Sequence, residues 1–500
     1  MIRGAALFCS VLIVTGLFAQ EVQDLPPQEP ELPAGAPSLS SQDEQRLAVI
    51  RYGTDTEIAN LIKTLRSEQT GGAAEEHPLD SELFALAEKS KNRAILTGIF
   101  TYYGDREKAG LEDKALRVID DRDYEAAETV NAAIEYLGKI QAAGVNAALI
   151  SILDGEEGRF LSGAIRALGK TAAKYDAGKT AEYLIDYYTN RDPGDENRRL
   201  IISAVGETKA KEGTSFLVSI VENEEERVPL RIAALEGLSK IADPGGLPAI
   251  VGAVSSKDPN VRSAAVGALG PFEGEQAEDA IMDSFRDSYY RTRIAAAKAA
   301  GERKLARAVP FLRFRAENDD VPAVRDEAVK SIALIGGDDA DAILWGLFSE
   351  RKNNDRIRIN AGEMLLTKGS RDYAQEVIVE LDEAKAKNQT NLYAGLLRIL
   401  GSAKSDTLED LARRFFALGG VVEKSYAIDI CANNNFRNLA GELRQLSDPK
   451  NGSLSRKSLA LLEEWGLSAE ASPEPAAEEP IPEEPEAPRE PILNEAADSE

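Results

Sequence analysis

The stretch VRSAAVGALG at residues 261–270 decides the fold, because close copies of it return at a nearly fixed interval. The copies combine an arginine with alanines, as in RIAALEGL at 231–238, RTRIAAAKAAG at 291–301, VRDEA at 324–328 and IRINA at 357–361. Intervals of 33, 31, 31, 32 and 33 residues separate the recurring arginines, which are Arg198, Arg231, Arg262, Arg293, Arg325 and Arg358. A period near 32 residues predicts a stack of repeated structural units.

Each unit contains two apolar helical stretches joined by a turn. The first stretch carries the arginine and an alanine-rich face, where small side chains allow neighbouring helices to approach closely. A turn rich in Gly, Asp or Pro follows, as in DPGG at 243–246, and a second helix such as residues 342–348 completes the unit. No segment shows the alternation of apolar and polar residues that would indicate a β-strand. The sequence therefore predicts an all-α fold, an α-solenoid or superhelix of about a dozen stacked helix-turn-helix repeats.

The arginine helix and the Asp-Pro or Asp-rich turn before it, at 258–262 and 319–325, resemble the bacterial HEAT-like repeats, also called PBS-lyase HEAT-like repeats. The resemblance is clear over 124–370. It weakens over 42–123 and 371–467, which we expect to be divergent helical repeats that cap the array. The resemblance implies a solenoid that binds proteins, or in some members holds a chromophore, with the second helix of each unit lining the concave surface. No motif for lyase activity maps onto this chain.

The N-terminal residues 1–19 have the layout of a secretory signal peptide. Arg3 precedes an apolar run from residue 5 to residue 18, and cleavage is expected near Ala19. The run is shorter than the roughly 20 residues that a membrane-spanning helix needs, so we expect no transmembrane span in the mature chain. We predict an exported protein of the periplasm or cell envelope. Retention of the segment as an anchor, or lipidation at Cys9, stays open.

Two further segments lack the apolar residues that a core requires. Residues 20–41 are rich in Pro, Gln and Glu, and we expect them to be a flexible linker. Residues 468–500 carry seven prolines and eleven acids against a single base, Arg489, and we expect them to be a disordered acidic tail.

Charge and composition disfavour several classes of function. The formal net charge of -26 offers no overall basic surface for nucleic acid, so we expect no nucleic-acid partner. A single histidine, His77, and two cysteines, Cys9 and Cys431, leave little material for a zinc site, a Cys/His dyad or a Ser-His-Asp triad. We therefore expect no enzyme activity, no catalytic or metal-binding residues and no cofactor. Cys431, in the stretch IDICA at 428–432, is predicted to be a small buried residue.

Two sets of residues are candidates for binding a partner. The segment 286–315 holds nine bases against two acids, and we expect an acidic protein partner, or the acidic tail in an intramolecular contact, to bind this stripe. Adjacent tyrosines on predicted second helices are the other set, because two neighbours on a helix cannot both point inward. The candidates are Tyr187, Tyr188, Arg286, Tyr289, Tyr290, Arg291, Arg303, Lys304, Arg307, Arg313 and Arg315.

The six repeat arginines are better explained as scaffold. An arginine at a fixed place in every unit is expected to bond turn carboxylates or carbonyls, such as those of Asp258 or Asp319, and to hold adjacent units in register. The function that these observations favour is a non-catalytic exported scaffold or adaptor that binds protein partners along the solenoid. The alternative is a carrier or lyase-like protein that holds a small ligand or chromophore in the concave groove, which a buried cluster of acids and tyrosines there would favour.

Overall fold

The structure, a computed structural model, describes residues 40–68, 77–155, 158–191 and 193–468. These residues form α-helices and short 3-10 helices, and the described part of the chain contains no strand. The predicted signal peptide, the linker up to residue 39 and the tail from residue 469 lie outside the described residues. Within the described residues, every helix is too short or too polar to span a bilayer.

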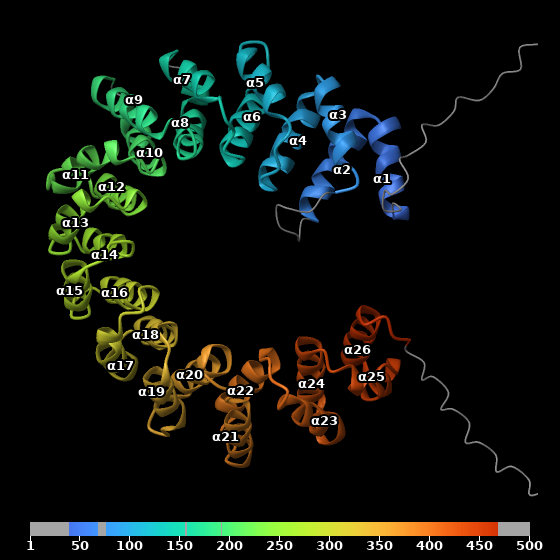
Figure 1. The fold of residues 1–500 in the computed structure, drawn as a ribbon. Coiled ribbons are helices and arrows are strands. Elements are labelled where there is room, and N and C mark those ends of the chain that lie inside the picture. The colour runs from blue at the N-terminus through green and yellow to red at the C-terminus, as the bar shows by residue number, and fades with distance from the viewer. Residues whose placement is uncertain (1–39, 69–76, 156–157, 192, 469–500) are drawn as a thin grey trace, which may run out of the picture.

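The helices alternate between two layers of a curved array (Figure 1). The odd-numbered helices form the outer layer and are α1 (Ser41–Tyr52), α3 (Asp80–Lys89), α5 (Glu112–Asp120), α7 (Asn146–Asp154), α9 (Ala177–Asn190), α11 (Thr214–Glu222), α13 (Leu247–Ala253), α15 (Glu275–Ser284), α17 (Val309–Asn318), α19 (Asp338–Ser349), α21 (Ala374–Ala386), α23 (Leu408–Leu418) and α25 (Ala440–Leu446).

The even-numbered helices form the inner layer, which lines the concave side. They are α2 (Asp55–Ser67), α4 (Arg93–Asp105), α6 (Ala127–Lys139), α8 (Gly158–Ala172), α10 (Gly194–Glu207), α12 (Val228–Ile241), α14 (Pro259–Ala268), α16 (Tyr290–Glu302), α18 (Pro322–Ile335), α20 (Asp355–Lys368), α22 (Thr390–Ser402), α24 (Val421–Asn434) and α26 (Ser453–Glu464). The 3-10 helices are η1 (Lys211–Gly213), η2 (Pro244–Gly246), η3 (Ala306–Ala308), η4 (Arg437–Leu439) and η5 (Pro449–Asn451).

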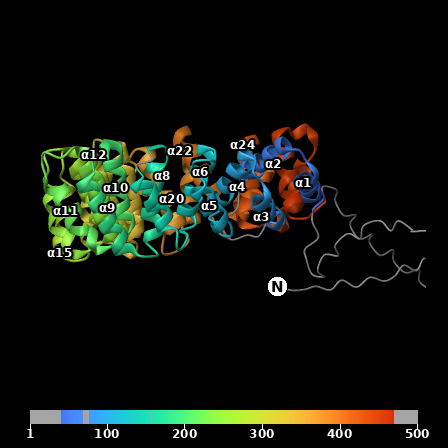
Figure 2. The same ribbon diagram turned by 90° about the horizontal axis from the view of Figure 1, so that it is seen from above.

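The array bends into a horseshoe, with α1 and α26 at the two ends of its open side (Figure 1). Viewed edge-on, the helices lie in a single band, with the C-terminal part behind the N-terminal part (Figure 2). The all-α solenoid predicted from the sequence is confirmed, and the helix pairs continue through both of the regions with weak repeat signatures.

The layers are reversed relative to the sequence expectation. The arginine-bearing first helices line the concave side, and the second helices, which we expected there, lie on the convex side (Figure 1). The physical reason is side-chain size. Neighbouring inner helices touch along their length, whereas neighbouring outer helices meet at few points, so the alanine- and glycine-rich helices take the shorter, inner arc.

Glycine allows the closest of these inner contacts. A Cβ on Gly206 of α10 would lie 2.4 Å from the Cα of Gly237 on α12, and a Cβ on Gly301 of α16 would lie 2.9 Å from the Cα of Ser331 on α18. Both distances are too short for any side chain. Large aliphatic and aromatic side chains fill the space between the layers instead, and Cys431 is buried among them, as predicted.

These contacts predict opposite effects for two glycines at the same place in their helices. Gly206→Ala forces α10 away from α12, and we expect it to lower the free energy of unfolding by about 1–3 kcal/mol. Gly267 is likewise the penultimate residue of α14, but a Cβ added there would have nothing within 4 Å. Gly267→Ala should raise stability by up to about 1 kcal/mol through helix propensity. Denaturant titration followed by circular dichroism measures both, and equal effects would refute the close-packing explanation.

Candidate partner-binding surface

The repeat arginines lie near the start of the inner helices, and their guanidinium groups reach back over the preceding turn. Arg231 donates from Nε to the carbonyl of Val221 at 3.0 Å, and Arg358 donates in the same way to Phe348 at 2.8 Å. Each acceptor lies ten residues earlier, at the end of the preceding outer helix. The arginine therefore satisfies a carbonyl that the end of that helix leaves without an intrahelical partner.

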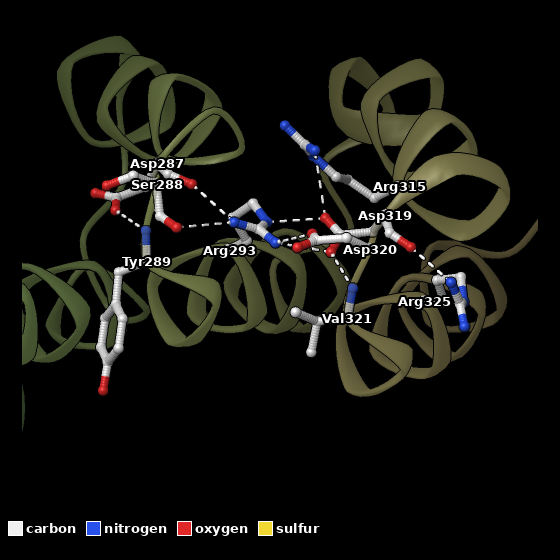
Figure 3. A network of polar contacts seen from close by, with 9 residues as sticks. All are labelled: Asp287, Ser288, Tyr289, Arg293, Arg315, Asp319, Asp320, Val321 and Arg325. Atoms are coloured by element: carbon white, nitrogen blue, oxygen red, sulfur yellow. Dashed lines mark hydrogen bonds and ion pairs between the residues drawn. The ribbon is translucent and has the colours of Figure 1, made fainter.

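Arg293 also connects two successive turns (Figure 3). Its Nη1 donates to the carbonyls of Asp287 and Ser288, at 3.0 and 3.2 Å, in the turn before its own helix. Its Nε and Nη2 bind the two carboxylate oxygens of Asp319, at 2.8 and 2.7 Å, in the turn before the next inner helix. One side chain thus sets the spacing of two repeats.

Arg262 repeats this arrangement, and Arg325 repeats the half that binds the turn before its own helix. Arg262 binds both carboxylate oxygens of Asp287, at 2.8 and 3.0 Å, while Asp258 accepts backbone N–H groups at the start of α14. Arg325 donates to the carbonyl of Asp319 at 2.7 Å. The result is a ladder of alternating arginines and turn aspartates over three repeats. Arg198 differs, because its guanidinium lies 5.2 Å from the ring of Tyr188.

Asp319 is the most completely enclosed acid of this ladder. Its side chain has no exposed surface, and it also accepts the N–H of Val321 at 3.0 Å. Burial raises the pKa of the Asp319 carboxyl, but the hydrogen bonds from Arg293 and Val321 outweigh burial, so its pKa lies below the usual value. The charged form is therefore the one that the fold stabilises.

The basic segment 286–315 is not a stripe of one charge. Arg286, Arg303 and Lys304 lie in turns, Arg291 lies on inner helix α16, and the remaining candidates lie on η3 and outer helix α17. Acids from outside the segment neutralise much of it. The pairs are Arg303 with Glu278 at 3.6 Å, Arg307 with Asp279 at 3.0 Å, Arg313 with Glu317 at 3.1 Å and Arg315 with Asp319 at 3.3 Å.

The three other candidate cations have no carboxylate within 4 Å among the described residues. Arg286 lies over the ring of Phe311 at 5.5 Å, and Arg291 donates to the hydroxyl of Tyr290 at 3.1 Å. Lys304 is exposed in the turn after α16. The candidate cations are therefore distributed over turns, an inner helix, a 3-10 helix and an outer helix, and their use by an acidic partner stays a prediction.

The candidate tyrosines are less exposed than expected. Tyr187 is only 5% exposed, so it belongs to the core, and Tyr188 packs edge-on against Phe216 with ring centroids 5.0 Å apart. Both lie on outer helix α9. Tyr289 precedes α16 and donates to the side chain of Asn260 at 3.2 Å, and its ring is 5.4 Å from that of Tyr290. The two pairs therefore contribute mainly to packing between repeats.

The concave side carries a site that the sequence interpretation missed. A groove of about 500 Å³ lies between inner helices α6 and α8, hereafter the α6–α8 groove. Its lining includes Arg159, Arg166, Lys170 and Asn131. A local signal was available, since residues 158–175 contain four bases and no acid. A second concave groove, of about 490 Å³, lies between α20 and α22 and is lined by Arg356 and Arg398 among others.

Ion pairs between neighbouring repeats cover much of the remaining concave side. The pairs on or beside the inner helices include Lys139 with Asp105, Arg227 with Asp195, Lys240 with Glu207, Arg398 with Glu363 and Lys457 with Asp429. Within the residues that the structure describes, His, Cys, Asp and Glu form no group of three or more placed to bind a metal ion.

The repeats match a known family. Residues 50–461 match the family described as "Spirochaete HEAT repeat protein". The chain belongs to this family. The bacterial HEAT-repeat resemblance seen in the sequence is thereby confirmed, and the match includes most of the two regions that we expected to be divergent.

Solved structures with a related helical arrangement include karyopherins. A mutant of Kap121p is 14% identical, with a TM-score of 0.42, and the match covers 84% of this chain and 52% of that one. Importin beta is 13% identical, with a TM-score of 0.40, and the match covers 84% of this chain and 69% of that one. The chain thus spans about half the length of Kap121p. Among curated proteins, the comparison gives no match.

The ladder predicts a pH-dependent loss of stability for Asp319→Asn. At pH 7 we expect this variant to lose on the order of 3 kcal/mol, because Arg293 loses its buried charged partner and keeps only an exposed one, Asp320. A lowered folded-state pKa means that the contribution is present above the unfolded pKa of about 3.9 and is lost as pH falls through the folded pKa. The difference from wild type should therefore shrink in acid.

Asp320→Asn is the matched control, because Asp320 also contacts Arg293, at 2.8 Å, but its side chain is 86% exposed. We expect little change in stability for this variant. Urea titrations of the three proteins from pH 7 to pH 3 measure the effect. Equal losses for both variants, or a pH-independent loss for Asp319→Asn, would argue against the ladder.

Proposed function

We propose that the protein is an exported, non-catalytic scaffold or adaptor that holds protein partners on the concave side of its solenoid. The observation that carries this proposal is the continuous inner layer from α2 to α26, which presents one side of every even-numbered helix to the same opening (Figure 1). A surface of this kind suits an extended protein segment better than a compact small molecule.

The chemistry of the concave side supports binding without catalysis. Many of its ionisable side chains pair between repeats, as Arg356 does with Asp326 and Arg398 with Glu363. Exposed ion pairs of this sort exchange readily with those of a ligand, because each contributes little to stability. Export is inferred from residues 1–19, where the sequence has the layout of a signal peptide.

The alternative, a carrier for a small ligand or chromophore, has less support. Such a protein would hold tyrosines and acids together in the concave groove, whereas Tyr183, Tyr187 and Tyr188 lie on outer helix α9. A buried cluster of this composition exists near α3 and α4, but its members bind each other. Tyr103 donates to Asp80 at 2.9 Å, and Lys108 forms an ion pair with the same carboxylate.

The proposal predicts that retention of a partner depends on concave side chains. The full-length chain is immobilised and incubated with an envelope extract, and the retained proteins are identified by mass spectrometry. We expect a specific protein to be retained by wild type and to be lost with the double variant Arg356→Glu/Arg398→Glu, which reverses two exposed charges of the α20–α22 groove.

Arg413→Glu is the control, because Arg413 is similarly exposed but lies on outer helix α23. Partner retention should survive this change. Retention that is equal for all three proteins, or lost in the control alone, would contradict a concave binding surface. Retention of a coloured or lipidic small molecule with no protein would favour the carrier.

A further inference from the structure

The α6–α8 groove contains cations that have no acidic partner among the described residues. Arg166 and Lys170 are one helical turn apart on the exposed side of α8, and no described carboxylate lies within 4 Å of either. Among the carboxylates that the structure describes, Arg159 pairs only with Asp123, at 3.5 Å, and both side chains of that pair are more than half exposed. Like charges one turn apart repel each other. An anionic ligand would relieve this repulsion.

The rest of the groove suits a peptide rather than a compact anion. Asn131 and Ser162 offer hydrogen-bonding groups, and the single lining acid, Glu135, is bound by Lys139 at 2.8 Å. Gly158 lines the groove with open space where a side chain would lie, so a peptide backbone can approach closely there. The positive charges lie in a row along α8, which matches an extended segment with acids at intervals.

We propose that the occupant of the α6–α8 groove is the chain's own acidic C-terminal segment, residues 469–500. Charge complementarity singles it out, since it holds eleven acids and one base in a chain whose net charge of -26 repels it from most other surfaces. Its seven prolines lower the entropy lost when it binds as an extended strand. The inference rests on the proposed function only in treating the concave side as a binding surface.

The segment is long enough to reach this groove. Ser468 follows α26 at one end of the horseshoe, and 32 residues follow it. In a polyproline conformation these span on the order of 100 Å. Thirteen inner helices about 9 Å apart, with twelve intervals between them, form an arc of roughly 110 Å. Because the inner layer curves into a horseshoe (Figure 1), the straight distance from α26 to the α6–α8 groove is shorter than the arc between them.

Zero-length cross-linking of the full-length chain tests the assignment. A carbodiimide joins a carboxylate to an amine only when the two are in contact, and mass spectrometry identifies the joined residues. We expect carboxylates of 469–500 to be joined to Lys170 several-fold more often than to Lys298, an exposed inner-helix lysine on α16 whose nearest acid, Glu302, is 3.8 Å away. High salt should abolish the preference, because these charges are solvated.

Arg166→Ala leaves Lys170 in place and should lower the yield at Lys170 several-fold, whereas Arg291→Ala on α16 should not change it. Both arginines are exposed, so both variants are expected to fold, which circular dichroism checks. Equal yields at Lys170 and Lys298, or an unchanged yield in Arg166→Ala, would overturn the assignment. So would cross-links that form only between copies in a mixture of isotopically labelled and unlabelled protein. None of these outcomes depends on whether an envelope partner is retained.

Discussion

The hydrogen bonds that the repeat arginines make to the turns and helix ends beside them are the contacts on which the repeat architecture depends. Arg293 joins carbonyls of one turn to the carboxylate of Asp319 in the next, so it fixes both the distance and the orientation between repeats. With helix packing alone, neighbouring helices can slide along each other, and their crossing angle can change by several degrees. A planar guanidinium with five fixed donors removes this freedom. Each repeat needs its arginine at the same place, which explains the regular arginine spacing in the sequence.

Curvature follows from the size of the side chains on the two layers. Glycines such as Gly206 and Gly237 bring inner helices together, while larger side chains keep the outer helices apart, so each repeat turns in the same direction. The bend in turn creates the concave side and brings the exposed faces of helices distant in sequence to one opening. The proposed binding function is therefore a consequence of how the core is packed, since the surface has its shape only while every repeat keeps its register.

The sequence predicts those features that a single repeat determines by itself. The helix pairs, their period and the burial of Cys431 follow from local apolar patterning, which each unit carries in full. Features that depend on contacts between units were not predictable in the same way. Both helices of a unit have an apolar face, so the pattern did not show which one lies inside. The charge balance around segment 286–315 cannot be read from the segment alone, because Glu278 and Glu317 lie just outside it in sequence but contact it in space. The α6–α8 groove was not predicted, because the acid-free sequence of α8 becomes significant only once the one acid that α6 contributes, Glu135, is seen to be bound by Lys139.

The most direct test of this account measures the opening of the horseshoe while one bond of the ladder is removed. Spin labels at Lys63→Cys on α2 and Leu459→Cys on α26 mark its two ends, in a chain with Cys9→Ser and with Cys431 shielded by burial. Pulsed dipolar spectroscopy then gives the distribution of distances between the labels. We predict one narrow distribution for this chain and a clearly broader one after Arg293→Met. An identical distribution after that substitution would contradict the claim that the arginine–aspartate ladder holds the repeats in register.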